Sequence, residues 1–297
     1  MSSQPVIGFL GYTGLVGSHI LPHLLEYHKQ GQIKLIILHR KGSDTSKIPD
    51  NVEKRLIDLS EGGKEVNKKA VEGLQVVLST VSGEGLRSQI YLVDALEGST
   101  TLKSFVHSDF GTNWTAKELK EAPGLSVIGV KEDVVEHAEK KNVPLTHVRV
   151  GAFDLFVFKF KAGGTDVKGN VVQVFRNSLK NPLRITTLPF LGQATAQLLL
   201  HPDEIANKTY QVYDHEPTGQ DFVDVLTKLN GSKPEITHYT EEEYQKGIQV
   251  PGTGAILAAL KAKWGDDNWG ATEPRPEVKG WKSISFEELT TEWAKQL

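Results

Sequence analysis

The chain has 297 residues, 38% of them hydrophobic, and a formal net charge of −3 at pH 7. This length suits one large α/β domain or a nucleotide-binding core with a smaller lobe, and the apolar share is enough for a sizeable core. The charge balance leaves no basic surplus for nucleic acid, and the absence of cysteine excludes disulfides, thiolate metal sites and cysteine nucleophiles.

Targeting and membrane segments are not expected. No apolar run approaches the roughly 18 residues of a membrane span. The apolar stretch near the N-terminus is not preceded by the charged segment that a signal peptide has. We therefore expect a cytoplasmic protein that acts on a small molecule, as a monomer or homodimer, with neither nucleic acid nor a membrane as a partner.

The first half of the chain alternates strand-like and helix-like patterns. Strands are predicted over residues 5–11, 33–40, 52–60, 74–81, 101–111 and 144–153. Helices are predicted between them over residues 15–30, 64–73, 86–98 and 131–142. Several strands are apolar on both faces, which is typical of the interior of a parallel sheet. The pattern predicts an α/β fold with a Rossmann-type doubly wound parallel sheet.

The regular alternation ends after Phe153. Residues 162–187 contain two short strand candidates and many glycines. The segments that follow predict a helix, a strand, a helix, and a strand entering an acidic helix, at 189–201, 208–214, 218–231 and 234–245. Residues 263–276 are loop-rich and aromatic. We expect a nucleotide-binding Rossmann domain over 1–153 and a smaller substrate lobe over 154–297, with segments at about 186–214 returning to the sheet.

The segment GYTGLVG lies between the first strand and the first helix, where a dinucleotide-binding turn belongs. Gly11 permits the tight turn, Gly14 lets the backbone approach a pyrophosphate, and Gly17 lets the helix pack close to the sheet. The helix N-terminus then offers N–H groups and a positive dipole end to the phosphates. The alternative is a simple turn. The other predicted cofactor contacts in this segment are Thr13, Leu15 and Val16.

The end of the second strand, LHRKGSDTSK, indicates which dinucleotide binds. NAD sites commonly have a carboxylate here for the ribose hydroxyl, whereas this strand ends at Arg40 and Lys41. A cationic pair suits a 2′-phosphate, so NADP(H) is the predicted cofactor, with Lys47 as a further candidate cation. The alternative is that these residues are ordinary solvated loop charges.

Two further strand ends supply candidate cofactor contacts. Asp58, after the third strand, is placed to reach the adenine or, alternatively, to cap the next turn. Ser79, Thr80 and Val81 end the fourth strand, where small side chains let the backbone approach the nicotinamide side of the cofactor. The same three residues are also consistent with an ordinary strand-to-helix turn.

Three features together, GYTGLVG, the basic end of the second strand and KSFVHSDFG, resemble the isoflavone reductase-like and NmrA-like family of atypical short-chain dehydrogenases. The resemblance covers the first 155 residues or so. That family typically has KRFxPSEFG at the fifth strand, and then a helix that begins with a catalytic lysine and is followed by GIPYTxV. In this chain the segment VKEDVVEHAEKKNVPLTHV places Lys131 at that lysine.

The resemblance implies an NADPH-dependent reductase of a small aromatic carbonyl or conjugated compound. The alternative is a non-catalytic regulator of the same family that senses NADP(H) and acts through protein partners. Lys131 favours the enzyme, because regulators of this family often lack the lysine. The chain departs from the family pattern at His107, which replaces a proline, and at Gly151 or Ala152, which replaces an asparagine. No Y-x-x-x-K sequence occurs, so the dyad of typical short-chain dehydrogenases is absent.

Lys131 has two candidate roles besides that of an ordinary surface lysine. At the start of a helix, near the positive dipole end, its charged form is disfavoured, so it could donate a proton to a carbonyl or enolate oxygen as hydride arrives. It could instead only bind the nicotinamide ribose hydroxyls. His107 and Asp109 flank the same site, where a lone strand histidine is more often structural than a proton relay.

The substrate candidates come from the segments after the fifth and sixth strands. Asp109, Phe110 and Trp114 are predicted to border the substrate, and Phe153 to pack on the nicotinamide, although each aromatic ring could equally belong to the core. Residues 153–160 carry four phenylalanines, predicted as core or as a lid over the substrate. No histidine pair or carboxylate cluster has metal-ligand spacing, so no metal is predicted.

Overall fold

The computed structural model describes residues 4–270 and 273–297 of the chain. The central layer is a sheet of seven strands in the spatial order β11 (Lys208–Val212), β6 (Leu145–Val150), β5 (Ser104–Val106), β4 (Val76–Ser79), β1 (Val6–Leu10), β2 (Lys34–His39) and β3 (Glu53–Leu56). Every strand pairing within this sheet is parallel. The predicted Rossmann-type doubly wound parallel sheet is confirmed.

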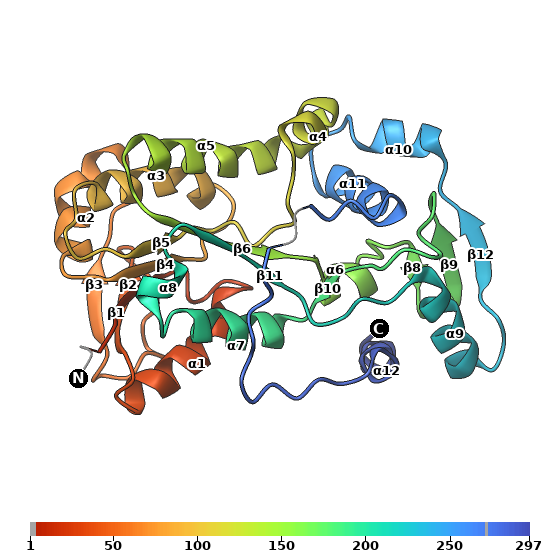
Figure 1. The fold of residues 1–297 in the computed structure, drawn as a ribbon, viewed down its shortest axis with the longest axis horizontal. Helices are drawn as coiled ribbons and strands as arrows, with labels where there is room; N and C mark the ends of the chain where they lie inside the picture. Colours follow the sequence, from red (N-terminus) through yellow and green to blue (C-terminus); the bar gives the residue numbers. More distant parts are fainter. Residues whose placement is uncertain (1–3, 271–272) are drawn as a thin grey trace.

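Helices cover both faces of this sheet (Figure 1). On one face α1 (Gly17–Lys29) packs against α7 (Leu188–Leu198). On the other face α3 (Gly85–Leu96) packs against both α2 (Lys64–Val71) and α5 (Ser126–Lys140). The sheet is therefore the middle layer of three, as the alternation of strands and helices predicts.

The side chains of β2 show why this sequence forms a central strand. Leu35 and Ile37 belong to the hydrophobic core on the α1 face. Ile36 and Leu38 belong to the core on the α2 and α3 face. A strand that is buried on both faces needs a continuous apolar run rather than an alternating pattern.

The strand order places a ligand crevice at one edge of the sheet. The order reverses between β1 and β4, so the connections that leave these two strands diverge to opposite faces. Ligands of open α/β sheets bind in the crevice at the carboxyl ends of the strands at such a point. The glycine segment, the basic end of β2 and the ends of β4, β5 and β6 all lie at this edge.

The second lobe lies beyond the carboxyl edge of the sheet (Figure 1). It contains a three-stranded sheet of β12 (Glu235–His238), β9 (Val171–Val174) and β8 (Thr165–Asp166), and a pair of β7 (Ala152–Phe153) and β10 (Ile185–Thr186). Its helices are α6 (Asp154–Phe158), α9 (Gly219–Asn230), α10 (Glu241–Gly247), α11 (Thr253–Gly265) and α12 (Phe286–Gln296). The lobe has its own core, in which Phe158, Phe222 and Trp264 are fully buried.

Short helices connect the larger elements, and some of the helices differ from the sequence prediction. The short ones are α4 (Ala116–Glu121), α8 (Pro202–Ile205), η1 (Glu61–Gly63) and η2 (Pro123–Leu125). α5 begins at Ser126, five residues before the predicted start, because the apolar residues before Lys131 continue the helix. α4, α11 and α12 were not predicted. α4 is too short to show a helical period, and α11 is buried on several sides, so its apolar residues do not form one stripe.

Part of the C-terminal half packs on the first lobe. β11 pairs with β6 at the edge of the main sheet, and α7 lies so close to α1 that a Cβ on Gly192 would be 2.2 Å from the carbonyl oxygen of His19. The division of the chain at residue 153, with segments near 186–214 returning to the sheet, stays a prediction. Residues 271–272, in the segment predicted to be loop-rich, and residues 1–3 lie outside the described residues. Within the described ranges, no helix combines the length and the apolar character needed to cross a bilayer.

Candidate functional site

The glycine segment forms a tight turn that is braced by the end of β4. Gly11 has a φ of +88°, and a Cβ on it would lie 2.7 Å from the carbonyl carbon of Thr80. A Cβ on Gly17 would lie 2.3 Å from the carbonyl oxygen of Gly11. The N–H of Thr80 donates to the Leu10 carbonyl and its hydroxyl donates to the Gly11 carbonyl, both at 2.9 Å. Gly11 and Gly17 therefore have no room for a side chain.

A cleft of about 540 Å³ opens beside this turn, where β1, β2 and β4 end. Six of the predicted cofactor residues line it: Gly11, Thr13, Gly14, Arg40, Thr80 and Val81. Leu15 and Val16 immediately precede α1, and Leu15 is 46% exposed. The first N–H groups of a helix have no partner within the helix, so the start of α1 suits an anion. The turn, the cleft and the helix end together fit the phosphates of a dinucleotide.

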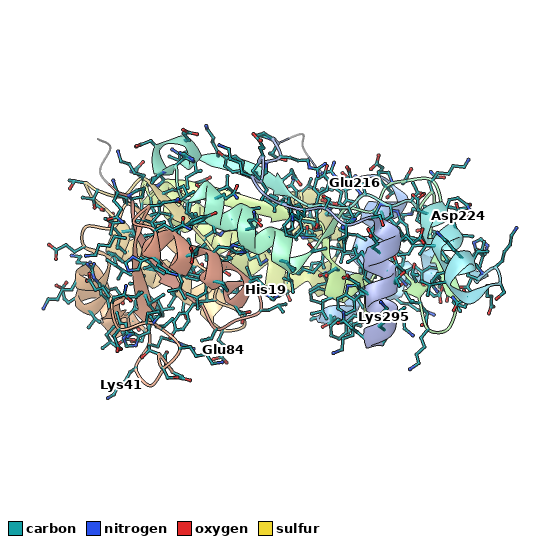
Figure 2. The ribbon with its side chains drawn as sticks, turned by 90° about the horizontal axis from the view of Figure 1, so that it is seen from below. His19, Lys41, Glu84, Glu216, Asp224 and Lys295 are labelled. Atoms are coloured by element: carbon teal, nitrogen blue, oxygen red, sulfur yellow. The ribbon has the colours of Figure 1, made fainter. Side chains whose placement is uncertain are left out.

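The basic end of β2 contributes one cation to the lining of the cleft. Arg40 is exposed and lines the cleft, whereas Lys41 and Lys47 are exposed outside its lining. Figure 2 shows Lys41 on a loop that projects from the molecule. Asp44 also lines the cleft, and hydrogen bonding of its carboxylate to Ser46, whose N–H lies 2.8 Å away, lowers the pKa of Asp44. The cleft thus offers both a cation and a carboxylate to a bound ribose.

Two of the predicted cofactor residues have other surroundings. The Asp58 carboxylate accepts a hydrogen bond from the Ser60 N–H (3.0 Å) and lies outside the lining of the cleft. This contact is the capping role that the sequence left open for Asp58. Ser79 is fully buried, and its hydroxyl has no hydrogen-bond partner among the described residues. The cofactor roles of Asp58 and Ser79 stay predictions.

Lys131 reaches the end of β5, where it meets Asp109. Its Nζ donates to the main-chain carbonyl of Asp109 and lies 3.5 Å from Asp109 Oδ1. The guanidinium of Arg149, from β6, contacts Asp109 Oδ2. The side chains of Lys131, Asp109 and Arg149 are 13%, 4% and 12% exposed. Burial alone would raise the pKa of Asp109, but the two cations outweigh it, so the pKa is lowered and the carboxylate is ionised.

The position of Lys131 along α5 differs from the prediction. Lys131 follows Ser126, the first residue of α5, by five residues. The expected interaction with the positive end of the helix is therefore wrong, because that effect is confined to the first turn. The charged group within ion-pair distance of Lys131 is Asp109, which Arg149 also contacts.

Hydrogen bonds connect the cleft to Lys131. The carbonyl of Val81, which lines the cleft, accepts a hydrogen bond from the Ser108 hydroxyl at 2.6 Å. Ser108 directly precedes Asp109, whose carbonyl accepts from Lys131. A Cβ on Gly111 would lie 3.2 Å from Lys131 Nζ. Lys131 thus contacts the segment after β5, which the Ser108 hydroxyl joins to Val81 at the border of the cleft.

Two histidines pack beside Asp109. His107 Nε2 and His147 Nδ1 are 3.0 Å apart. Burial lowers the pKa of His107 to about 3 and also lowers the pKa of His147, so both rings are neutral at pH 7. His107, Asp109 and His147 each place a possible metal-ligand atom within 4.8 Å of the others. Sequence spacing missed this cluster because β5 and β6 are far apart in the chain, but its contacts are those of an ion-paired network, with Arg149 on the carboxylate.

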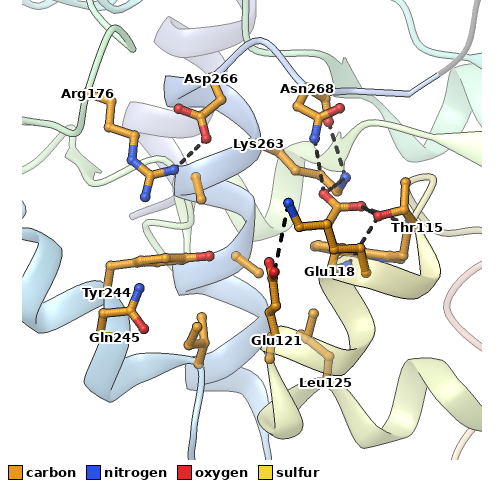
Figure 3. Close-up of a pocket in the computed structure, with 16 residues that line it drawn as sticks. Thr115, Glu118, Glu121, Leu125, Arg176, Tyr244, Gln245, Lys263, Asp266 and Asn268 are labelled. Carbon is orange, nitrogen blue, oxygen red and sulfur yellow. Dashed lines mark hydrogen bonds and ion pairs between the residues drawn. The ribbon is translucent and has the colours of Figure 1, made fainter.

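Phe110 and Trp114 lie in different cores. Phe110 packs in the core on the α1 face of the sheet. Trp114 packs in the core of the second lobe and lines a separate cavity of about 540 Å³ between α4, α10 and α11. Figure 3 shows this cavity with the Glu118 and Lys263 pair at its side. The structure therefore does not bring Trp114 together with Phe110, and the substrate role of each residue stays a prediction.

Three of the four phenylalanines at 153–160 form a row. The ring centroids of Phe153 and Phe156 are 6.1 Å apart, and those of Phe156 and Phe160 are 5.5 Å apart. Phe160, at the end of the row, is 47% exposed, whereas Phe158 is buried against Phe222. The row begins at Phe153, which follows the carboxyl end of β6, and runs outward to solvent.

Arg149 is the site residue that sequence reasoning missed. A signal for it exists in the pattern of β6, LTHVRV. Strands inside a parallel sheet are expected to be apolar on both faces, yet His147 and Arg149 alternate on one face of this strand. A buried arginine near the carboxyl end of a central strand needs a nearby carboxylate, and Asp109 at the end of the neighbouring strand supplies it.

Comparisons with known proteins place this fold in a family. A family model described as the NmrA-like family matches residues 3–276. An isoflavone reductase homolog of Nicotiana glauca is 25% identical over 153 residues, which are 50% of this chain and 48% of that protein. A phenylcoumaran benzylic ether reductase of Pinus taeda is 25% identical over 160 residues, 52% of this chain and 51% of that protein. The chain thus spans about half the length of these curated relatives.

Solved structures resemble the whole chain. The binary complex of leucoanthocyanidin reductase with NADPH from Vitis vinifera has a TM-score of 0.73 at 19% identity and covers 98% of this chain and 99% of that chain. A crystal structure of isoflavone reductase has a TM-score of 0.75 at 18% identity and covers 99% of this chain and 100% of that chain. At these identities the likeness shows a shared fold, second lobe included.

Proposed function

This chain belongs to the NmrA-like family, and from that premise we propose that it is an NADPH-dependent reductase of a small aromatic carbonyl or conjugated compound. The curated relatives are named as reductases or their homologs, and the names refer to aromatic compounds. The alternative, a non-catalytic sensor of NADP(H), finds no support in these names.

The glycine turn and the start of α1 would hold the cofactor. Gly11 and Gly17 have no side chain to keep the cofactor from the backbone, and the pyrophosphate would lie at the turn and the positive end of α1. Arg40, at the lining of the cleft, would pair with the 2′-phosphate. When bound, NADPH supplies a hydride from its nicotinamide ring to the electrophilic carbon of the substrate.

Lys131 would supply the proton. As the hydride reaches the substrate, negative charge develops on the carbonyl or enolate oxygen, and an ammonium Nζ that borders the site can donate a proton to it. The proton is then replaced from solvent. Asp109 has its carboxylate engaged by Arg149, and His107 is neutral and buried, so Lys131 is the proton donor that the site offers.

The row of Phe153, Phe156 and Phe160 supports an aromatic substrate. Stacked and edge-to-face ring pairs add to the stability that burial of an aromatic ring provides. The row runs from Phe153, which packs on the core at the α1 face of the sheet, to the exposed ring of Phe160. An aromatic compound would find ring faces along this row.

The observation that carries the proposal is the connection between the cleft and Lys131 through Val81, Ser108 and Asp109. The test measures NADPH oxidation by the purified protein with aryl ketones, enones and quinones, and compares the parent with Lys131→Met. We expect turnover to fall by roughly 10²–10⁴-fold, the usual contribution of a general acid.

Lys140→Met is the matched control, since Lys140 lies on the same helix, is 73% exposed and, within the described part of the chain, pairs with Glu136 alone, at 3.5 Å. Titration of NADPH fluorescence separates the two roles of Lys131. A weaker affinity for NADPH with unchanged turnover would limit Lys131 to cofactor binding. NADPH binding without turnover of any compound would favour the sensor.

A further inference from the structure

The ammonium of Lys131 is not part of a simple ion pair. Its direct contact is with a neutral acceptor, the main-chain carbonyl of Asp109, and the nearest carboxylate oxygen is 3.5 Å away. The other carboxylate oxygen is in contact with the Arg149 guanidinium. One buried carboxylate thus serves two cations, and Arg149 has the closer ionic contact.

We propose that Asp109 and Arg149 are positioning residues for Lys131: Asp109 fixes the ammonium at the end of β5, and Arg149 takes up the carboxylate so that Lys131 is not held in a full lysine–carboxylate pair. The inference deepens the proposed function, on which it rests for the catalytic use of Lys131. The contacts themselves do not depend on that function.

The other charged groups around Lys131 do not replace these two. Glu132, the next residue on α5, lies near both Arg149 and Lys131, and burial raises the pKa of its carboxyl, but among the described residues it forms no ion pair with either cation. His107 and His147, from β5 and β6, are neutral at pH 7. On α3, which packs against α5, the nearby charges pair with other residues of α5, in the pairs Arg87–Asp133 and Asp94–His137.

Two substitutions act on Lys131 in opposite directions. Asp109→Asn removes the negative charge and leaves Arg149 in place, so the charged form of Lys131 is disfavoured. Arg149→Met removes the competing cation and leaves Asp109 free to pair with Lys131, so the charged form is favoured. If the cluster had only a structural role, the two substitutions would not shift the titration of Lys131 in opposite directions.

The experiment is an NMR titration of the full chain with ¹³C-labelled lysine side chains, without NADPH or substrate. The Lys131 signal is assigned by its loss in Lys131→Arg. We expect the midpoint of Lys131 to fall by about one pH unit or more in Asp109→Asn and to rise by about one or more in Arg149→Met, as opposite and like charges at this distance do.

Glu118→Gln is the control. It breaks a different buried ion pair, in which Lys263 Nζ lies 2.6 Å from Glu118 Oε1, and is expected to leave the Lys131 midpoint unchanged. If either single variant fails to fold, judged by circular dichroism, the double variant Asp109→Asn/Arg149→Met takes its place, because it leaves one cation of the cluster without a carboxylate, where Asp109→Asn leaves two. The opposing effects predict that its midpoint lies between those expected of the single variants and close to that of the parent.

The proposal is overturned if the single variants move the midpoint in the same direction or leave it unchanged, or if the double variant moves it as far as a single substitution should. These results are independent of turnover. Opposite shifts in a protein that oxidises no NADPH would keep the positioning and reject the reductase. If neither variant shifts the midpoint of Lys131 but turnover needs Lys131, the positioning is rejected and the reductase is kept.

Discussion

Two buried lysines, Lys131 at the carboxyl edge of the sheet and Lys263 in the second lobe, have different surroundings. Lys263 Nζ donates to Glu118 Oε1 at 2.6 Å and to the Asn268 carbonyl at 3.1 Å, and it lies 4.4 Å from the centroid of the Trp114 ring. Among the described residues, Lys263 is the only cation within ion-pair distance of Glu118. Lys131, in contrast, shares its carboxylate with an arginine.

The number of cations that share the carboxylate separates a structural lysine from one placed for proton transfer. Lys263 lines a cavity, whereas Lys131 lies outside the lining of the cleft and is joined to it through Ser108 and Val81, so lining a cavity does not by itself mark a lysine for proton transfer. Glu118 also closes the capping box of α4 with Thr115, so its pair with Lys263 joins α4 to α11 (Figure 3). Lys263 has a carboxylate to itself and clamps two elements, whereas the carboxylate beside Lys131 is divided between two cations.

The largest effect expected at pH 7 separates the two lysines by stability. Lys263→Met should lower the free energy of unfolding by about 3 kcal/mol, because it leaves a partly buried carboxylate unpaired. Lys131→Met should lower the free energy of unfolding by less, because Asp109 keeps its ion pair with Arg149. Urea denaturation of both variants measures the difference. The double variant Lys263→Met/Glu118→Gln should recover part of the lost stability. Equal losses for Lys263→Met and Lys131→Met would contradict the difference inferred between the two lysines.

The next expected effect is a pH dependence of stability that arises at the carboxyl edge of the sheet. His107 has a pKa of about 3 in the folded chain, against the ordinary histidine value of 6.5 that applies when the chain is unfolded. The folded state therefore binds fewer protons than the unfolded state, so this contribution to stability is complete above about pH 6.5 and declines by about 1.4 kcal/mol per pH unit as the pH falls toward 3. Denaturation of the parent and of His107→Gln across this range measures it. Parallel pH dependence in the two proteins would show that His107 titrates normally.

The sequence predicted the sheet well and the charged network poorly, for physical reasons. Runs such as that of β2 are apolar because both faces of the strand are covered, and this pattern is local in the chain. The steric need for Gly11 and Gly17 is also a local property of a turn that enters a helix. The pairing of Arg149 with Asp109 depends on the register of β5 against β6, which no spacing within one segment reveals. The same holds for Trp114, whose ring meets Lys263 from far along the chain.

The smallest effect concerns a cation that, unlike both lysines, is exposed. Arg40 lines the cleft next to Asp44, so the site offers a partner for a 2′-phosphate and another for a free ribose hydroxyl. We expect NADPH to bind more tightly than NADH, and Arg40→Ala to reduce that preference by about tenfold, the size of one charge-assisted hydrogen bond. Lys34→Ala is the control, because Lys34 lies at the opposite end of the same strand and pairs with Glu53 at 2.7 Å. Fluorescence titration with both nucleotides measures the preference. Equal affinities in the parent would instead make Asp44 the residue that selects the nucleotide.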